Sequence, residues 1–149
     1  RLHDAFSKAG YELATTLRRQ MPALLEVYPH VALLGMLGVS ERYPYKVGRT
    51  NTYWPGQSAE RRKAHLLERW EMLLEWLRRC IDGIDMRLPD AGEHTFEHLK
   101  RFEDAIDGLV CAWVATEFLN NSAVPLGDGD AAIWVPSSAM QFAKDAHGA

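Results

Sequence analysis

A long helical pattern in the chain covers residues 96–113, FEHLKRFEDAIDGLVCAW. Ile106, Val110 and Trp113 recur at the spacing of one helix face, with charged residues between them. This periodicity predicts an amphipathic helix. We expect it to extend over Thr95–Leu119 and to organise the elements around it.

Two acids, Asp104 and Asp107, lie three residues apart on this helix, so their side chains are neighbours. Two like charges in that position repel, by a few tenths of a kcal/mol when solvated and by more where water is excluded. A bound cation would remove this cost. For the pair alone, a solvated helix face that carries two carboxylates by chance is the simpler interpretation.

A third carboxylate, Glu26, lies in the short apolar run at residues 22–30, PALLEVYPH. The run predicts a strand at Ala23–Val27, apolar on both faces and typical of a sheet covered by helices. A charge near the carboxyl end of such a strand lies where open α/β sheets bind ligands, although a glutamate that simply reaches solvent is the alternative. Because a lone strand leaves its backbone unpaired, we expect pairing with a strand around Ile133, with another copy of the chain or with a further segment.

The remaining patterns predict three more helices, one turn and one more strand. These are helices at Leu2–Arg19, His30–Leu37 and Ala59–Ile81, a turn at Gly127–Asp130 and a strand at Ala132–Val135. Gly38 ends the second helix, and Ser58 is the expected N-cap of the third. No strand is expected before Met21.

Composition predicts a soluble globular chain, with residues 1–149 forming a single domain or part of one. Of 149 residues, 47% are hydrophobic and 25% charged, and the formal net charge is −3. With no excess of positive charge, any nucleic-acid binding must be local. Cys80 and Cys111 fall in helical patterns without C-x-x-C spacing, which favours buried, reduced thiols over a disulfide or zinc site and suits a cytoplasmic protein. No apolar run is long enough to span a membrane, so we expect no membrane partner.

The predicted loop at residues 41–57 is long for a connection and combines tyrosines and a tryptophan with basic residues, prolines and glycines. Long loops in compact domains are often functional. Aromatic side chains can stack on bases while Lys46 and Arg49 contact phosphates, and Arg62 could contribute from the start of the next helix. A surface loop pinned by its own aromatics is equally compatible with the sequence.

A different hypothesis comes from the H-x-x-E-H segment at residues 94–98, HTFEH. In inverted zinc peptidases two histidines at this spacing bind zinc and the glutamate acts as base. A third ligand is required, and Glu117 is the one glutamate that follows Glu103. A zinc peptidase is therefore the third hypothesis for this chain.

Five groups of residues in a fixed order carry a family resemblance. They are EVYPH at 26–30, YK at 45–46, Arg62, EDAIDGLVCA at 103–112 and the segment 129–136 that ends in IWVP. Over about Met21–Pro136 the chain resembles domain of unknown function 429, a family of predicted nucleases thought to have a ribonuclease H-like fold. The acidic helix is also similar to the C-terminal helix of Holliday-junction resolvases in the same superfamily.

This resemblance implies an α/β, ribonuclease H-like fold and metal-dependent hydrolysis of nucleic-acid phosphodiester bonds. Glu26, Asp104 and Asp107 would be the catalytic residues and the ligands of Mg²⁺ or Mn²⁺, and Lys46 and Arg62 would contact the substrate. Two cations about 3.5 to 4 Å apart would then bring the Glu26 carboxyl group within roughly 8 Å of at least one of the aspartates.

Enzymes of the ribonuclease H-like class place a catalytic Asp on the first strand of an N-terminal half rich in hairpins, and no such strand is expected here. The chain therefore resembles a helix-rich C-terminal portion that lacks the N-terminal strands. We expect little or no cleavage by these 149 residues alone. An N-terminal segment or another copy would complete the sheet. A catalytically silent scaffold or binding module of the same fold is the alternative function.

Overall fold

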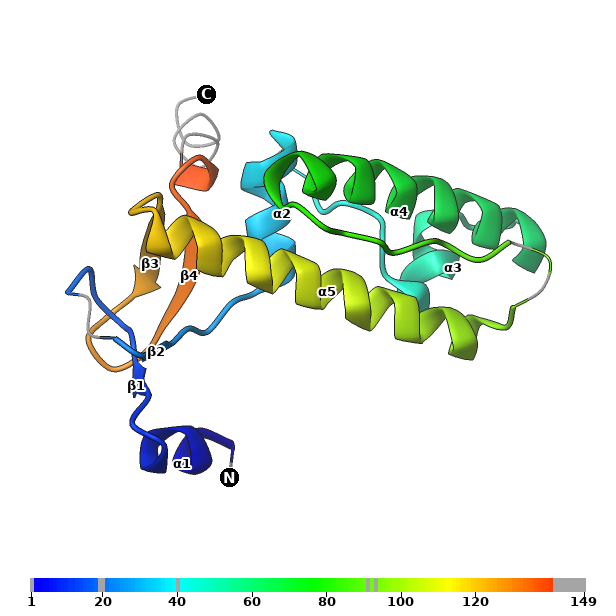
Figure 1. The fold of residues 1–149 in the computed structure, drawn as a ribbon. Helices are drawn as coiled ribbons and strands as arrows, with labels where there is room; N and C mark the ends of the chain where they lie inside the picture. Colours follow the sequence, from blue (N-terminus) through cyan, green and yellow to red (C-terminus); the bar gives the residue numbers. More distant parts are fainter. Residues whose placement is uncertain (1, 19–20, 40, 91, 93, 141–149) are drawn as a thin grey trace. The chain divides into compact units, whose positions relative to one another are not determined.

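The computed structural model describes residues 2–18, 21–39, 41–90, 92 and 94–140. The chain divides into two compact units: unit 1 comprises Arg1–Arg42 and Val114–Ala149, and unit 2 comprises Tyr43–Trp113. The described part is mixed α/β and rich in helix, with two small two-stranded sheets (Figure 1). Across the described residues, no helix is both long and apolar enough to cross a membrane.

Unit 1 contains the strands. Its elements are α1 (Leu2–Lys8), β1 (Glu12–Leu13), β2 (Ala23–Leu24), α2 (Pro29–Leu37), β3 (Ala123–Gly127), β4 (Ala132–Pro136) and the end of α5 (Phe96–Leu119). β1 pairs in parallel with β2, and β3 pairs antiparallel with β4. A parallel bridge between Glu26 and Ile133 connects the two pairs, and the N–H of Trp134 donates to the Glu26 carbonyl at 2.7 Å. The predicted pairing of the Glu26 segment with the Ile133 strand is confirmed, although β2 itself ends at Leu24.

Buried groups of β4 and α2 hold unit 1 together. The indole N–H of Trp134, a fully buried side chain, donates to the carbonyl of Ala14 at 2.6 Å. α2 packs against β4, and a Cβ at Gly35 would lie only 2.2 Å from the Cβ of Ala139, so the helix needs glycine at this close approach. Gly38, at φ 65°, ends α2 as predicted.

The N-terminal segment differs from its prediction. The helix expected at Leu2–Arg19 ends at Lys8, and Gly10, at φ 86°, turns the chain toward β1. The expectation of no strand before Met21 is therefore wrong, because β1 lies there. The absence of the hairpin-rich N-terminal half stays a prediction. β1 forms because β2 lies beside it, a tertiary pairing that local apolar spacing does not reveal. Leu17, which lies within the range predicted as that helix, is 63% exposed.

β3 is a second strand that the sequence did not predict. It contains Pro125, a residue that argues against a strand because it lacks an N–H. The predicted turn that follows is confirmed: the side chain of Asp128 accepts hydrogen bonds from the backbone N–H groups of Asp130 and Ala131 at 2.9 and 3.1 Å. These bonds lower the pKa of Asp128. The strand predicted next is observed as β4.

Unit 2 is helical and has its own core. Its elements are η1 (Val47–Arg49), α3 (Thr50–Tyr53), α4 (Ala59–Cys80) and α5 as far as Trp113. Figure 1 shows α4 running alongside this part of α5. The fully buried apolar side chains on the two helices are Leu66, Trp70, Leu73, Leu74, Leu77, Leu99, Ile106 and Val110. Both predicted helices, and Ser58 as N-cap, are confirmed.

The segment at residues 41–57, predicted as a long loop, contains η1 and α3 and is pinned by its aromatic residues. Tyr45 is fully buried, and its carbonyl accepts a hydrogen bond from the indole N–H of Trp70 at 2.8 Å. The hydroxyl of Tyr43 donates to the carbonyl of Arg69 at 3.1 Å. These two tyrosines therefore anchor the segment to α4 and are not exposed for base stacking.

The cysteines are less buried than predicted. Cys80, at the end of α4, is exposed and Cys111 is half-buried, and the two are not joined by a disulfide. Burial, followed by the negative charge of Asp107, raises the pKa of the Cys111 thiol. The prediction of two buried thiols is therefore wrong for Cys80.

The N-cap of α4 can be tested with a matched pair of substitutions. The hydroxyl of Ser58 accepts a hydrogen bond from the N–H of Arg61 at 3.3 Å. Ser58→Ala should lower the free energy of unfolding by about 1 kcal/mol, and Ser58→Gly by only a few tenths, because glycine leaves the helix end open to water. Urea unfolding measures both. A larger loss for the glycine variant than for the alanine variant would contradict the assigned cap.

Candidate functional site

The carboxylates of Glu103, Asp104 and Asp107 lie together on α5, in the part of the helix that belongs to unit 2. One oxygen from each lies within 4.8 Å of the others, close enough to share an ion. We call these three residues the acidic cluster. It contains both aspartates predicted from helix spacing, together with Glu103, which that prediction left out.

Glu103 is the buried member of the acidic cluster, only 2% exposed. It shares a stripe of α5 with Leu99, Ile106 and Val110, which are fully buried. One of its oxygens accepts a hydrogen bond from the N–H of Val47 at 2.6 Å. Burying a carboxylate costs free energy unless it is paired and hydrogen-bonded, and the N–H of Val47 supplies one of the bonds that Glu103 needs. The signal in the sequence was a glutamate at an apolar position of an amphipathic helix.

Asp107 accepts a hydrogen bond at each of its oxygens. The hydroxyl of Tyr45 donates to one at 2.8 Å, and the ammonium group of Lys46 donates to the other. Burial of Tyr45 raises the pKa of its phenol well above the ordinary value, and the hydrogen bond to Asp107 and the nearby carboxylate charges raise it further. The phenol therefore remains a donor to Asp107.

Two lysines neutralise most of the charge of the acidic cluster. The ammonium group of Lys46 lies 3.2 Å from an oxygen of Glu103, and that of Lys100 lies 2.8 Å from the same oxygen and also bonds Asp104. Hydrogen bonds to Asp104 and Glu103 raise the pKa of Lys100. The side chain of Asp104 is 63% exposed, so the cluster is open to solvent on that side. An entering cation would have to replace at least one ammonium group.

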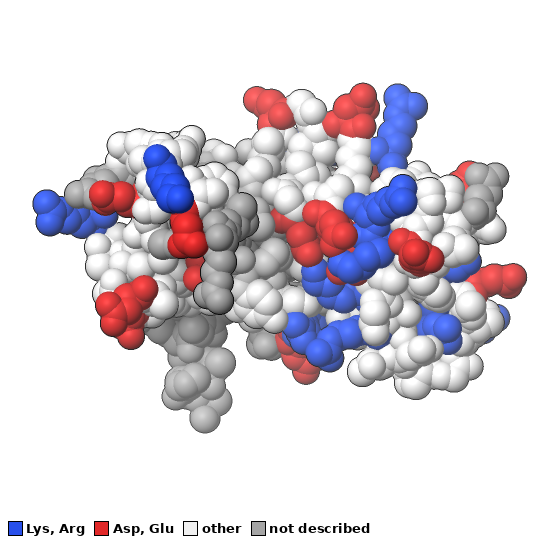
Figure 2. Space-filling view, turned by 90° about the horizontal axis from the view of Figure 1, so that it is seen from below, with Lys and Arg blue, Asp and Glu red and all other residues white. Residues whose placement is uncertain are grey.

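Lys46 and Arg62, the predicted substrate contacts, are bonded within the chain. Lys46 is held by the acidic cluster, whereas a guanidinium N–H of Arg62 donates to the carbonyl of Gln57 at 2.8 Å. The guanidinium also lies 5.7 Å from the ring centre of Phe96. Figure 2 shows Lys and Arg side chains interleaved with Asp and Glu side chains on the face in view. Substrate contact by either residue stays a prediction.

Glu26, the third predicted metal ligand, belongs to unit 1, where it is exposed. Its backbone carbonyl is bonded to the N–H of Trp134. Its approach to the carboxylates of α5 stays a prediction.

The two histidines that the zinc hypothesis requires, His94 and His98, lie together. The rings of His94 and His98 stack with their centres 4.4 Å apart. Within the described residues, the potential metal-binding group of three or more side chains is the acidic cluster, and it contains no histidine. The described part of the chain therefore lacks a third zinc ligand for a peptidase.

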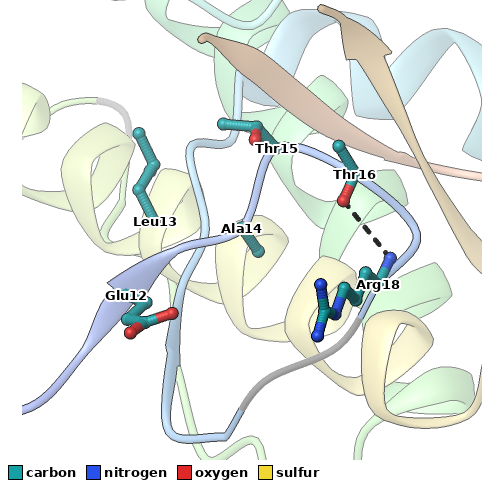
Figure 3. Close-up of a pocket in the computed structure, with 6 residues that line it drawn as sticks. All are labelled: Glu12, Leu13, Ala14, Thr15, Thr16 and Arg18. Carbon is teal, nitrogen blue, oxygen red and sulfur yellow. Dashed lines mark hydrogen bonds between the residues drawn. The ribbon is translucent and has the colours of Figure 1, made fainter. Parts of the chain in front are cut away.

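A cavity of about 230 Å³ in unit 1 is formed by a single segment. Its lining residues are Glu12, Leu13, Ala14, Thr15, Thr16 and Arg18 (Figure 3). The hydroxyl of Thr15 donates to the carbonyl of Gly129 at 2.8 Å, which fastens the segment to the β3–β4 turn. The lining contains none of the predicted site residues, and its one acid and one base give no preference for a charged ligand.

A protein family described as "Protein of unknown function (DUF429)" matches residues 3–132. No curated protein and no solved structure matches the sequence. The matched range includes the acidic cluster and Glu26, and it starts well before Met21, where the resemblance was first placed. The family inferred from the order of the motifs is therefore confirmed.

The buried carboxylate can be tested by removing it. Glu103→Ala leaves the N–H of Val47 without its acceptor and Lys46 with one carboxylate fewer. We expect the free energy of unfolding to fall by about 2 to 4 kcal/mol. The matched control is Asp104→Ala, which removes an exposed ion pair and should cost no more than about 0.5 kcal/mol. Urea unfolding that gave equal losses would contradict the structural role of Glu103.

The raised pKa of Tyr45 predicts a loss of stability in alkali. Above the ordinary phenol pKa of about 10 the unfolded chain releases the proton that the folded chain retains, so stability falls as pH rises. Tyr45→Phe should be less stable at pH 8, because it lacks the bond to Asp107, but should show a smaller further loss at about pH 10.5. Burial also raises the pKa of Tyr43, but that residue is common to both proteins. If the unsubstituted protein and Tyr45→Phe lost the same stability between the lower and the higher pH, the assignment of the raised pKa to Tyr45 would be contradicted.

Proposed function

The chain belongs to this family of proteins of unknown function, and we propose that it is a divalent-cation-dependent nuclease that holds its cation at the acidic cluster. The proposed fold is ribonuclease H-like, with which the mixed α/β structure is compatible. The observation that carries the proposal is the convergence of three carboxylates, one of them buried, on a single helix.

The donor set supports a hard cation. Its ligand atoms are all carboxylate oxygens, which suit Mg²⁺ or Mn²⁺ better than zinc. Two ammonium groups now lie against these oxygens, as expected where an excess of negative charge has to be balanced. Because Asp104 is exposed, a cation can reach the acidic cluster from solvent on that side.

Each residue has a proposed role in this function. When bound, divalent cations activate the attacking water and stabilise the leaving oxygen of a phosphodiester. Asp104 and Asp107 would be ligands, with Glu103 holding the backbone beside them and Glu26 proposed as a further ligand. Lys46, released from Asp107 when a cation enters, would be free to contact a phosphate of the nucleic acid, as would Arg62.

A catalytically silent scaffold is the second candidate, and one observation favours it. Each oxygen of Glu103 and Asp107 already has a hydrogen-bond or ion-pair partner within the chain. Carboxylate oxygens that all have partners within the chain are expected where the role of the acidic cluster is structural, namely to hold the segment around Val47 on α5.

Cation binding and cleavage separate the two candidates. The protein is titrated with Mn²⁺ by calorimetry, and its melting temperature is followed with and without the ion. Saturation at 100 times Kd should add about 2.7 kcal/mol of stability. Cleavage is assayed on labelled single-stranded and duplex DNA and RNA. Asp107→Asn should abolish both effects. Asp85→Asn, which alters an acid of unit 2 that is 93% exposed, should change neither.

Three outcomes are distinguishable. Binding and cleavage that are both lost in Asp107→Asn support the nuclease. Because little or no cleavage is expected of these 149 residues alone, cleavage is also assayed with a protein extended at its N-terminus by an Asp-bearing strand. Binding without cleavage by that extended protein favours the scaffold, and absence of any Mn²⁺ effect refutes a cation site at the acidic cluster. Glu26→Gln tests the wider ligand set: it should weaken Mn²⁺ binding if Glu26 is a ligand and leave it unchanged otherwise.

A further inference from the structure

Two histidines at the start of α5 form a feature that the proposed nuclease does not use. His94 lies just before the helix and His98 in its first turn, and the hydroxyl of Thr95 fixes this turn by accepting the N–H of His98 at 3.2 Å. The imidazole rings are nearly parallel, at 22°, with their centres 4.4 Å apart. His94 is half-exposed and His98 exposed, so solutes can reach both.

We propose that His94 and His98 together bind one transition-metal ion, Zn²⁺ or Cu²⁺, with solvent completing its coordination. Imidazole nitrogens bind Zn²⁺ at 2.0–2.1 Å, which places two ligating nitrogens of a tetrahedral ion roughly 3.3 Å apart. The ring centres are 4.4 Å apart but the rings are stacked, so both side chains have to rotate until one nitrogen of each points at the same ion.

The surroundings of His98 add a carboxylate but no complete peptidase site. A cavity of about 210 Å³ is lined by Thr95, Glu97, His98 and Arg101. Glu97 brings a negative charge near the imidazole, and Arg101 offsets it. Because the described residues supply no third protein ligand to the pair, the ion would be bound through two nitrogens and would be readily exchangeable.

The histidine pair and the acidic cluster differ in the cations that they select. Imidazole suits Zn²⁺ and Cu²⁺, whereas carboxylate oxygens suit Mg²⁺ and Mn²⁺. The inference therefore does not rest on the proposed nuclease, and either can fail without the other.

The test titrates the protein with Zn²⁺ at pH 7.5 in excess Mg²⁺, which occupies oxygen sites. Calorimetry gives the affinity, and NMR of the imidazole ring protons shows which histidines respond. We expect the signals of His94 and His98 to shift together at one equivalent. His94→Gln and His98→Gln should each weaken the binding at least about tenfold, because each removes one of two ligands. The matched control is His65→Gln, a histidine of unit 2 that stacks on Trp54 and pairs with Glu68.

The arms of the experiment distinguish this site from others. Asp107→Asn should keep the full Zn²⁺ affinity, and so should Cys80→Ser, which removes the exposed thiol. Unchanged affinity in His98→Gln would overturn the proposal, as would an equal loss in His65→Gln. Circular dichroism of each variant separates loss of a ligand from loss of the helix.

Discussion

The hydrogen bond from the N–H of Val47 to the carboxylate of Glu103 fixes the geometry of unit 2 around its charged groups. A buried carboxylate requires strong donors, and the chain supplies a backbone N–H and two ammonium groups. Once Val47 is held, the two residues before it have little freedom. Tyr45 and Lys46 then reach Asp107, one turn further along α5. One buried charge thus positions three consecutive residues of a segment that would otherwise be a loop.

α5 and the residues just before it carry two kinds of potential cation ligand within a short distance in unit 2. Nitrogen ligands lie at its start and oxygen ligands near its middle, and the five residues from His98 to Glu103 correspond to roughly 7.5 Å along the helix axis. The two groups also differ in how the chain treats them without an ion. The carboxylates are compensated by lysines, whereas the histidines stack on each other. Without a cation the oxygen group is therefore paired within the chain, whereas the two imidazole rings contact each other.

Helices were predictable from this sequence where their apolar spacing is long and regular. α4 and α5 have such spacing, and their buried faces match the predicted ones. β1 and β3 were not predictable, because each owes its conformation to a partner strand and one contains a proline. Asp104 and Asp107 could be found from like charges on one turn. Glu103 was missed because an acid inside an apolar stripe resembles an interruption of the pattern. Its donor at Val47 lies 56 residues away in the sequence and could not be inferred locally.

The bond between the indole of Trp134 and the carbonyl of Ala14 joins positions 120 residues apart, and the bond between Thr15 and Gly129 joins positions 114 apart. A ribosome adds about 5–20 residues per second, so Ala14 would wait roughly 6 to 24 s for its partner to be synthesised. Throughout that interval the segment after β1 lacks its hydrogen bonds to the β3–β4 hairpin. The exposed side chains nearby, Leu17 and Met21, make this a period of vulnerability to aggregation. Unit 2 consists of contiguous residues, so it can fold before all of unit 1 has been synthesised. The middle of the chain would then fold first, and the two flanking segments that form unit 1 would follow.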